Sequence, residues 1–186
     1  DAFCGAGGNV IQLALSDPTG VVLAIDIDPV KVEMARHNAR LYGVAARVEF
    51  IVGDFFALAP RLRAHAIHLS PPWGGPSYSE ASAFDLATMQ QTCGLPRDGL
   101  ELFDVAQHVA PSVAYYLPRN TVRSQLKTLA RRHASQRCEL QEILKRAGKT
   151  EWVHVLAAFY DAAPPDWLLK KSPGTHARRV GPFEHG

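Results

Sequence analysis

Residues 70–76 read SPPWGGP and follow the apolar run AHAIHL directly. Pro71 and Pro72 fix their own φ angles and present carbonyl oxygens without matching N–H donors. A carbonyl and the Ser70 hydroxyl can accept the two hydrogens of an exocyclic amine, which turns the nitrogen lone pair toward an electrophile. Trp73 offers a broad face on which a nucleobase can stack. The competing interpretation is a rigid turn whose tryptophan plugs the edge of the core.

A second set of residues has the chemistry to hold a ribose and an adenine. Gly5 and Gly7 lie in the turn DAFCGAGGN, where glycine allows a tight turn and close approach to a ligand. This turn lacks both the third glycine of a dinucleotide fingerprint and the GK[ST] of a phosphate loop. Asp26 can accept both ribose hydroxyls, and Asp54 with Phe55 can bind an adenine amino group and cover its ring. The competing interpretation of each aspartate is a helix cap or loop residue.

Asp26 and Asp54 each end a strand-like run, and a third aspartate, Asp1, opens the DAFCGAGGN motif. Together they describe a ligand with an ammonium group, a ribose and an adenine. S-adenosylmethionine has these parts and no pyrophosphate, which explains the absent third glycine.

The segments that carry these residues alternate between strand-like and helix-like patterns. Apolar, β-branched runs predict strands over 20–26, 47–54, 64–69 and 112–118, and two more strands joined around 147–149. Helices are predicted over 10–16, 29–42, 98–110 and 121–134, with Asp28 as an N-cap. Residues 77–97 are expected to form an irregular loop. Such alternation predicts an α/β fold with a mostly parallel sheet whose ligands bind at the carboxyl ends of the strands.

The composition is that of a single globular domain of 186 residues, and the apolar runs are too short to span a membrane. Three cysteines without a CxxC pair argue against a disulfide framework or a metal site. Residues 1–118 carry 7 basic and 12 acidic side chains, whereas residues 119–186 carry 13 and 6. The basic helix over 121–134 is either a solvated face or a footprint for an anion or nucleic acid.

Taken together, DAFCGAGGN, AIDIDPVKVEMARHNARLYG, VEFIVGDFF, LSPPWGGPSY and YYLPRN resemble the trimethylguanosine synthases, the RNA cap guanine-N2 methyltransferase family. The resemblance covers roughly residues 1–160. It implies a class I S-adenosylmethionine-dependent methyltransferase domain over 1–161, Rossmann-like, with a mostly parallel seven-stranded sheet and helices on both faces. The first strand is then largely missing, and an additional N-terminal segment that closes over the cofactor and cap is expected. Residues 162–186 are expected to be a poorly ordered tail.

The resemblance also implies an activity. Methyl groups would pass from S-adenosylmethionine to the 2-amino group of 7-methylguanosine at RNA 5′ caps, leaving S-adenosylhomocysteine. It assigns Asp1, Gly5, Gly7, Asp26, Asp54 and Phe55 to the cofactor, and Ser70, Pro71 and Trp73 to the reacting amine and base. It assigns Trp73, Tyr78, Arg119 and Asn38 to the substrate, with Trp73 stacked on the cationic 7-methylguanine and Arg119 on the cap phosphates.

We therefore expect a monomeric nuclear or nucleolar enzyme, also present in the cytoplasm, that acts on capped snRNA or snoRNA without a metal or a membrane. One alternative is a methyltransferase for another exocyclic amine, such as adenine N6 or an internal guanine N2. Another is a cap-binding module without catalysis. A nicotinamide-dependent dehydrogenase fits less well, because the third glycine and a hydride-site histidine or tyrosine–lysine pair are lacking.

Overall fold

The computed structural model describes residues 1–75, 78, 81–132, 138–147, 150–160 and 175–182. In chain order, its elements are α1 Gly8–Ser16, β1 Val22–Asp26, α2 Pro29–Leu41, η1 Ala45–Arg47, β2 Val48–Val52, α3 Phe55–Leu58, η2 Ala59–Arg61, β3 Ala66–Leu69, η4 Leu86–Thr88, α4 Met89–Cys93, α5 Gly99–Val109, β4 Ser112–Pro118, α6 Arg123–Arg132, β5 Cys138–Ala147, β6 Thr150–Tyr160 and β7 Thr175–Pro182. This succession is an α/β fold, as the sequence predicts.

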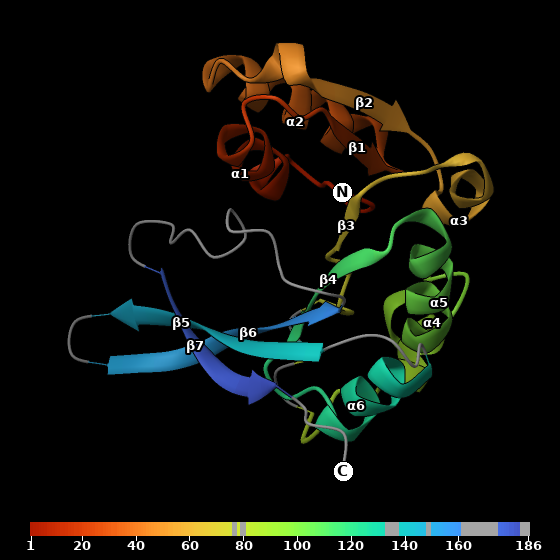
Figure 1. The fold of residues 1–186 in the computed structure, drawn as a ribbon, viewed down its shortest axis with the longest axis vertical. Coiled ribbons are helices and arrows are strands. Elements are labelled where there is room, and N and C mark those ends of the chain that lie inside the picture. The colour runs from red at the N-terminus through yellow and green to blue at the C-terminus, as the bar shows by residue number, and fades with distance from the viewer. Residues whose placement is uncertain (76–77, 79–80, 133–137, 148–149, 161–174, 183–186) are drawn as a thin grey trace.

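The strands form two sheets, one of two strands in the order β1-β2 and one of five strands in the order β3-β4-β6-β5-β7. The pairs β1–β2 and β3–β4 are parallel, and the three pairs among β4, β6, β5 and β7 are antiparallel. The expectation of a mostly parallel sheet was therefore wrong, because the hairpin β5–β6 and strand β7 reverse direction. Figure 1 shows the small sheet with α1 and α2 at one end of the molecule and the larger sheet at the other.

The first residues of the chain lie between the two sheets, where the N-terminus is seen in Figure 1. The Asp1 amine donates to the Leu23 carbonyl at 2.8 Å, and the Asp1 carbonyl accepts from the Ile25 N–H at 2.9 Å. On the other side, the Ala2 N–H donates to the His68 carbonyl at 3.1 Å. Residues 1–4 thus link β1 to β3 as the expected remnant of a strand.

Two apolar cores lie on opposite sides of this layer. The smaller one joins α1 and α2 to β1, with Val10, Val32 and Ala35 fully buried. The larger one joins β3, β4 and β6 to α5 and α6, and its fully buried members include Leu102 and Leu126. Helices therefore cover both faces, so the ends of the strands remain as the place where polar side chains can gather.

Three local patterns are confirmed and two are corrected. Asp28 caps α2 by accepting the Val30 N–H at 2.9 Å, with Pro29 in the first turn. The strand predicted over 112–118 matches β4, and β5 and β6 form the predicted hairpin. The segment 77–97, expected to be irregular, contains η4 and α4 in its described part. The expected tail contains strand β7, while 161–174 and 183–186 lie outside the described residues.

Candidate functional site

The glycine-rich turn and the end of β1 are joined by one buried carboxylate. Asp26, 8% exposed, accepts the Gly5 N–H through Oδ2 at 2.9 Å and the Asp28 N–H through Oδ1 at 3.0 Å. Each carboxylate oxygen has two lone pairs, so Asp26 retains acceptor capacity for further hydroxyl donors. Asp26 therefore holds the glycine-rich turn in place, and it lies where the sequence predicts a ribose contact.

Position 7 requires glycine for two reasons, its backbone conformation and its close approach to α2. Its φ of 88° is in the left-handed region, and a Cβ there would lie 3.0 Å from Ala35 of α2. Gly5 also has a positive φ, of 51°. The turn therefore packs closely on α2 while its backbone faces the carboxyl end of β1.

Asp1 contacts β3 across the link between the sheets. Its Oδ1 accepts the Phe3 N–H at 3.1 Å and lies 3.5 Å from Nδ1 of His68. Among the described residues, neither Asp1 Oδ2 nor the ring nitrogens of His68 have a hydrogen-bond partner, although all are buried. Burial is the main cause that lowers the pKa of His68 to about 3. His68 is therefore a neutral ring packed against Asp1.

Asp54 makes the helix-cap contact of the competing interpretation, and Phe55 lies in the core. Asp54 is the N-cap of α3 and accepts the Phe56 N–H at 3.0 Å. Phe55 is only 2% exposed and packs in the core, with its ring centroid 6.0 Å from that of Phe3. The buried Phe55 ring has no open face for an adenine, because α3 turns its first side chain inward. Phe56 is half-buried, with the Arg97 guanidinium 6.0 Å from its ring centroid.

Asn38 lies on α2 beside the glycine-rich turn. Its Nδ2 donates to the Ala6 carbonyl at 2.9 Å. The structure thus gives Asn38, predicted from the resemblance as a substrate residue, a contact that holds the turn in shape.

The SPPW turn leaves the carboxyl end of β3 as predicted. Pro71 is buried, Ser70 is half-buried and Pro72 is exposed. Trp73 is half-buried against the larger core, and its buried Nε1 has no hydrogen-bond partner among the described residues. Trp73 therefore makes the core contact of the competing interpretation, while its stacking on a base stays a prediction. Gly74 has a φ of 83°, and a Cβ there would lie 2.6 Å from the Thr92 carbonyl.

Tyr78 and the turn after β4 complete this part of the site. The Tyr78 ring meets the Trp73 ring edge to face, with centroids 5.3 Å apart and planes at 79°. Nδ2 of Asn120 donates to the carbonyls of Tyr78 at 3.0 Å and Ala81 at 2.8 Å. Sequence reasoning missed Asn120, although it directly follows Arg119 in the LPRN motif. Residues 76–77 and 79–80 lie outside the described residues.

Arg119 is exposed at the carboxyl end of β4. Pro118 of β4 is paired with Val155 of β6, which brings Arg119 next to His154. Burial, and then the charges of Lys145 and Arg119, lower the pKa of His154. The pairing of β4, β6 and β5 therefore brings Arg119, Lys145 and His154 into one region, which their spacing in the sequence did not indicate.

The basic helix α6 is partly neutralised by acidic neighbours. Arg123 forms an ion pair with Glu142 of β5, and Arg132 forms one with Asp104 of α5, each at 2.6 Å. The four-residue spacing of Arg123, Lys127 and Arg131 does place them on a helix as predicted. The ion pairs favour the interpretation of α6 as mainly a solvated face.

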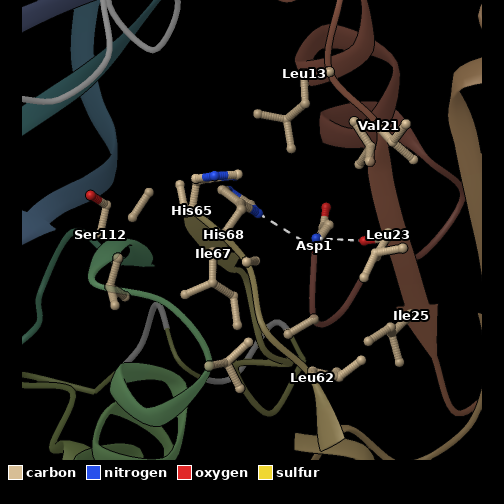
Figure 2. Close-up of a pocket in the computed structure, with 18 of the residues that line it drawn as sticks. Asp1, Leu13, Val21, Leu23, Ile25, Leu62, His65, Ile67, His68 and Ser112 are labelled. Carbon is tan, nitrogen blue, oxygen red and sulfur yellow. Dashed lines mark hydrogen bonds and ion pairs between the residues drawn. The ribbon is translucent and has the colours of Figure 1, made fainter.

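A cavity of about 770 Å³ lies at the other end of the strands. Figure 2 shows Val21 and Leu23 on one side of it, with His65, Ile67 and Ser112 on the other. Val21 precedes β1, His65 precedes β3 and Ser112 begins β4, so this cavity faces the amino ends of the strands. Of the residues predicted to bind the cofactor, Asp1 and Phe55 line this cavity, whereas Asp26, Ser70 and Arg119 at the carboxyl ends do not.

In the described part of the chain, no cluster of three or more His, Cys, Asp or Glu side chains is arranged to hold a metal ion. None of the helices described is long and apolar enough to cross a membrane.

The fold is that of methyltransferases. The chain superimposes with a TM-score of 0.56 on the tRNA m1G37 methyltransferase of Methanocaldococcus jannaschii, at 17% identity, covering 87% of this chain and 41% of that one. It superimposes with a TM-score of 0.52 on a methyltransferase from Geobacter sulfurreducens, at 17% identity, covering 87% and 70%. At this identity the likeness establishes the fold alone.

The family follows from the sequence. Residues 1–160 match the RNA cap guanine-N2 methyltransferase family, and the chain belongs to it. The trimethylguanosine synthase of Schizosaccharomyces pombe is 42% identical over 127 residues, which is 65% of this chain and 50% of that protein. That of Saccharomyces cerevisiae is 31% identical over 137 residues, which is 71% and 42%. The chain thus spans half or less of the length of these relatives.

Proposed function

We propose that this chain transfers methyl groups from S-adenosylmethionine to the exocyclic 2-amino group of 7-methylguanosine at RNA 5′ caps. The observation that carries the proposal is the SPPW turn at the carboxyl end of β3, with Tyr78 edge-on against Trp73. In α/β sheets this end of the strands is where ligands bind. Family membership supports the reaction class, and the turn supports the choice of a nucleobase amine.

The residues at the neighbouring strand ends fit the cofactor. The backbone of the turn at Gly5 and Gly7 would face it, the remaining lone pairs of Asp26 would accept ribose hydroxyls, and Asp54 would take the adenine amine. Asp1 has a buried carboxylate oxygen without a partner, which suits an ammonium group. When bound, the cofactor supplies an electrophilic methyl group on a sulfonium centre and leaves as the neutral thioether.

The reacting amine would be held by three residues of the SPPW turn. The Ser70 Oγ and the Pro71 carbonyl would each accept one hydrogen of the 2-amino group, which aims the nitrogen lone pair away from the turn. Trp73 would hold the ring that carries the amine, and a cationic 7-methylguanine adds about 0.5–2 kcal/mol through its contact with the indole. As the new N–C bond forms, the S–C bond breaks, and the nitrogen then releases a proton to water. Alignment is the main contribution of the protein.

The phosphate side of the cap would meet the cationic region after β4. Arg119 is exposed there, and the strand pairing brings Lys145 of β5 into the same region. Arginine pairs well with phosphate oxygens because its donors form a planar fork. This arrangement supports a substrate that carries phosphate next to the base.

The test is methyl transfer from labelled S-adenosylmethionine to RNA with a 7-methylguanosine cap, compared with RNA carrying an unmethylated guanosine cap. The full-length protein should label the first and not the second. Trp73→Ala should abolish most of the cap affinity, whereas Trp152→Ala, which removes the 38% exposed indole of β6, should not. Equal labelling of both caps, or labelling of adenine or internal guanine instead, would overturn the proposal.

A further inference from the structure

The side-chain amide of Asn120 connects two turns that follow different strands. Asn120 stands two residues after β4, and its Nδ2 donates to the Tyr78 carbonyl at 3.0 Å and to the Ala81 carbonyl at 2.8 Å. An amide nitrogen has two hydrogens, so both are used. Two carbonyl acceptors also determine which way the amide is oriented, because the oxygen could not face them.

The segment between the SPPW turn and η4 is a loop that contains Tyr78. Hydrogen bonds from residues near Asn120 also hold the end of this loop next to η4. The Phe84 N–H donates to the Asn120 carbonyl at 2.9 Å, and the Val122 N–H donates to the Phe84 carbonyl at 3.0 Å. The Gln125 amide accepts the Leu86 N–H at 3.0 Å. It also donates to Asp85 Oδ1 at 2.5 Å. The loop is therefore attached at two points, and Asn120 holds the one nearer to the SPPW turn.

The contact of Asn120 reaches Trp73 through Tyr78. The Tyr78 N–H donates to the Gly75 carbonyl at 3.4 Å, and the Tyr78 ring lies edge-on to the Trp73 ring at 5.3 Å. A shift of the Tyr78 backbone would therefore move the ring that borders the indole. Tyr78 comes from the loop and Trp73 from the turn, so their angle of 79° depends on what holds the loop.

We propose that Asn120 is a positioning residue for base binding, which sets the Tyr78–Trp73 angle by holding the Tyr78 and Ala81 carbonyls. This inference rests on the proposed function, because it assumes that a base stacks on Trp73. Asn120 Oδ1 is buried without a partner among the described residues. The hydrogen bonds given for this side chain are thus those that its nitrogen donates.

Two substitutions at Asn120 separate the donor from the volume of the side chain. Asn120→Ala removes both hydrogen bonds, and Asn120→Asp keeps the size but places a carboxylate oxygen against two carbonyls. Loss of two hydrogen bonds predicts about tenfold weaker binding of 7-methylguanosine for Ala, and a larger loss for Asp. Affinity for S-adenosylmethionine should stay within about twofold of that of the unsubstituted protein.

The matched control is Gln125→Glu, which disturbs the Asp85 end of the loop without touching Tyr78. All variants are compared in the full-length protein by thermal unfolding and by quenching of tryptophan fluorescence with 7-methylguanosine. The nucleoside is the probe because it lacks the phosphates that Arg119 would bind. A residue that only stabilises the fold would lower the melting temperature in both loop variants without a selective loss of base binding.

The outcomes are distinct. Weak base binding in both Asn120 variants, with near-normal binding in Gln125→Glu, supports the inference. Base affinity within twofold of normal in a folded Asn120→Ala overturns it and leaves the proposed function intact. If the unsubstituted protein binds S-adenosylmethionine but not 7-methylguanosine, the proposed function fails and this inference fails with it.

Discussion

The Asp26 carboxylate accepts the Gly5 N–H through Oδ2 at 2.9 Å, which ties the end of β1 to the glycine-rich turn. Its other oxygen accepts the Asp28 N–H at 3.0 Å, just before α2 begins. One side chain therefore orders the turn and presents an acceptor where a ribose is expected. This double role makes the loss of Asp26 more severe than the loss of a single ligand contact.

Replacing Asp26 by Ala should weaken S-adenosylmethionine binding at least tenfold and also lower stability. Hydrogen bonds to a charged acceptor contribute about 1.5–3 kcal/mol each, and the Gly5 and Asp28 amides would lose theirs. Titration calorimetry and thermal unfolding measure the two effects. Asp28→Ala is the control, because it removes only a helix cap worth about 1 kcal/mol. Normal cofactor affinity in a folded Asp26→Ala would contradict the assignment.

Gly7→Ala should destabilise the protein by about 1–3 kcal/mol, because alanine is strained at a φ of 88° and its Cβ would press on Ala35. Gly8→Ala is the matched control. A Cβ at Gly8 meets nothing within 4 Å, and alanine favours the first turn of α1. Urea unfolding should show loss of stability for the first variant and none for the second. Equal effects would refute the role given to Gly7.

The stability of the protein should decrease as the pH falls from about 6.5 toward 3, partly through His68. Its pKa in the folded state is about 3, lowered mainly by burial, while an unfolded histidine titrates near 6.5. The unfolded chain therefore binds a proton that the folded protein does not, which amounts to about 2 kcal/mol at pH 5. The groups that face the ring are Asp1 and Tyr116.

His68→Phe should reduce the difference between the free energies of unfolding at pH 7 and pH 5, as measured by urea unfolding. His65→Asn, an exposed residue three positions earlier in the same segment, should leave it unchanged. An unaltered slope in a well-folded His68→Phe would show that His68 titrates normally.

Arg119→Ala should weaken binding of 7-methylguanosine triphosphate about tenfold and leave binding of the nucleoside unchanged. A charged hydrogen bond to phosphate is lost in the first case and does not exist in the second. The difference should shrink at high salt, since Arg119 is exposed. Arg36→Ala on α2, whose guanidinium pairs with Glu33, serves as a control. A parallel loss for nucleoside and triphosphate would place Arg119 at the base instead.

Local patterns were sufficient to predict much of the fold. The strand over 112–118, the Asp28 cap and the β5–β6 hairpin each depend on residues close together in sequence, so periodicity and capping chemistry predicted them. Strand β7 depends on pairing with β5, which no local pattern in 175–182 indicated. Which strands pair depends on contacts between residues far apart in the sequence, and local propensity does not predict these contacts.

For the site, the sequence alone determined the residue types and their order: a glycine turn, acids at strand ends and a proline-rich turn with a tryptophan. Only the tertiary structure decided which side chains are available. Phe55 is buried in the core. Asn38 of α2 donates a hydrogen bond to the glycine-rich turn, and Asn120 donates one to the Tyr78 carbonyl. Arg119, Lys145 and His154 likewise become neighbours only through the pairing of β4, β6 and β5. The reason is geometric: a motif specifies chemistry along the chain, whereas burial and contact depend on what the rest of the chain packs against it.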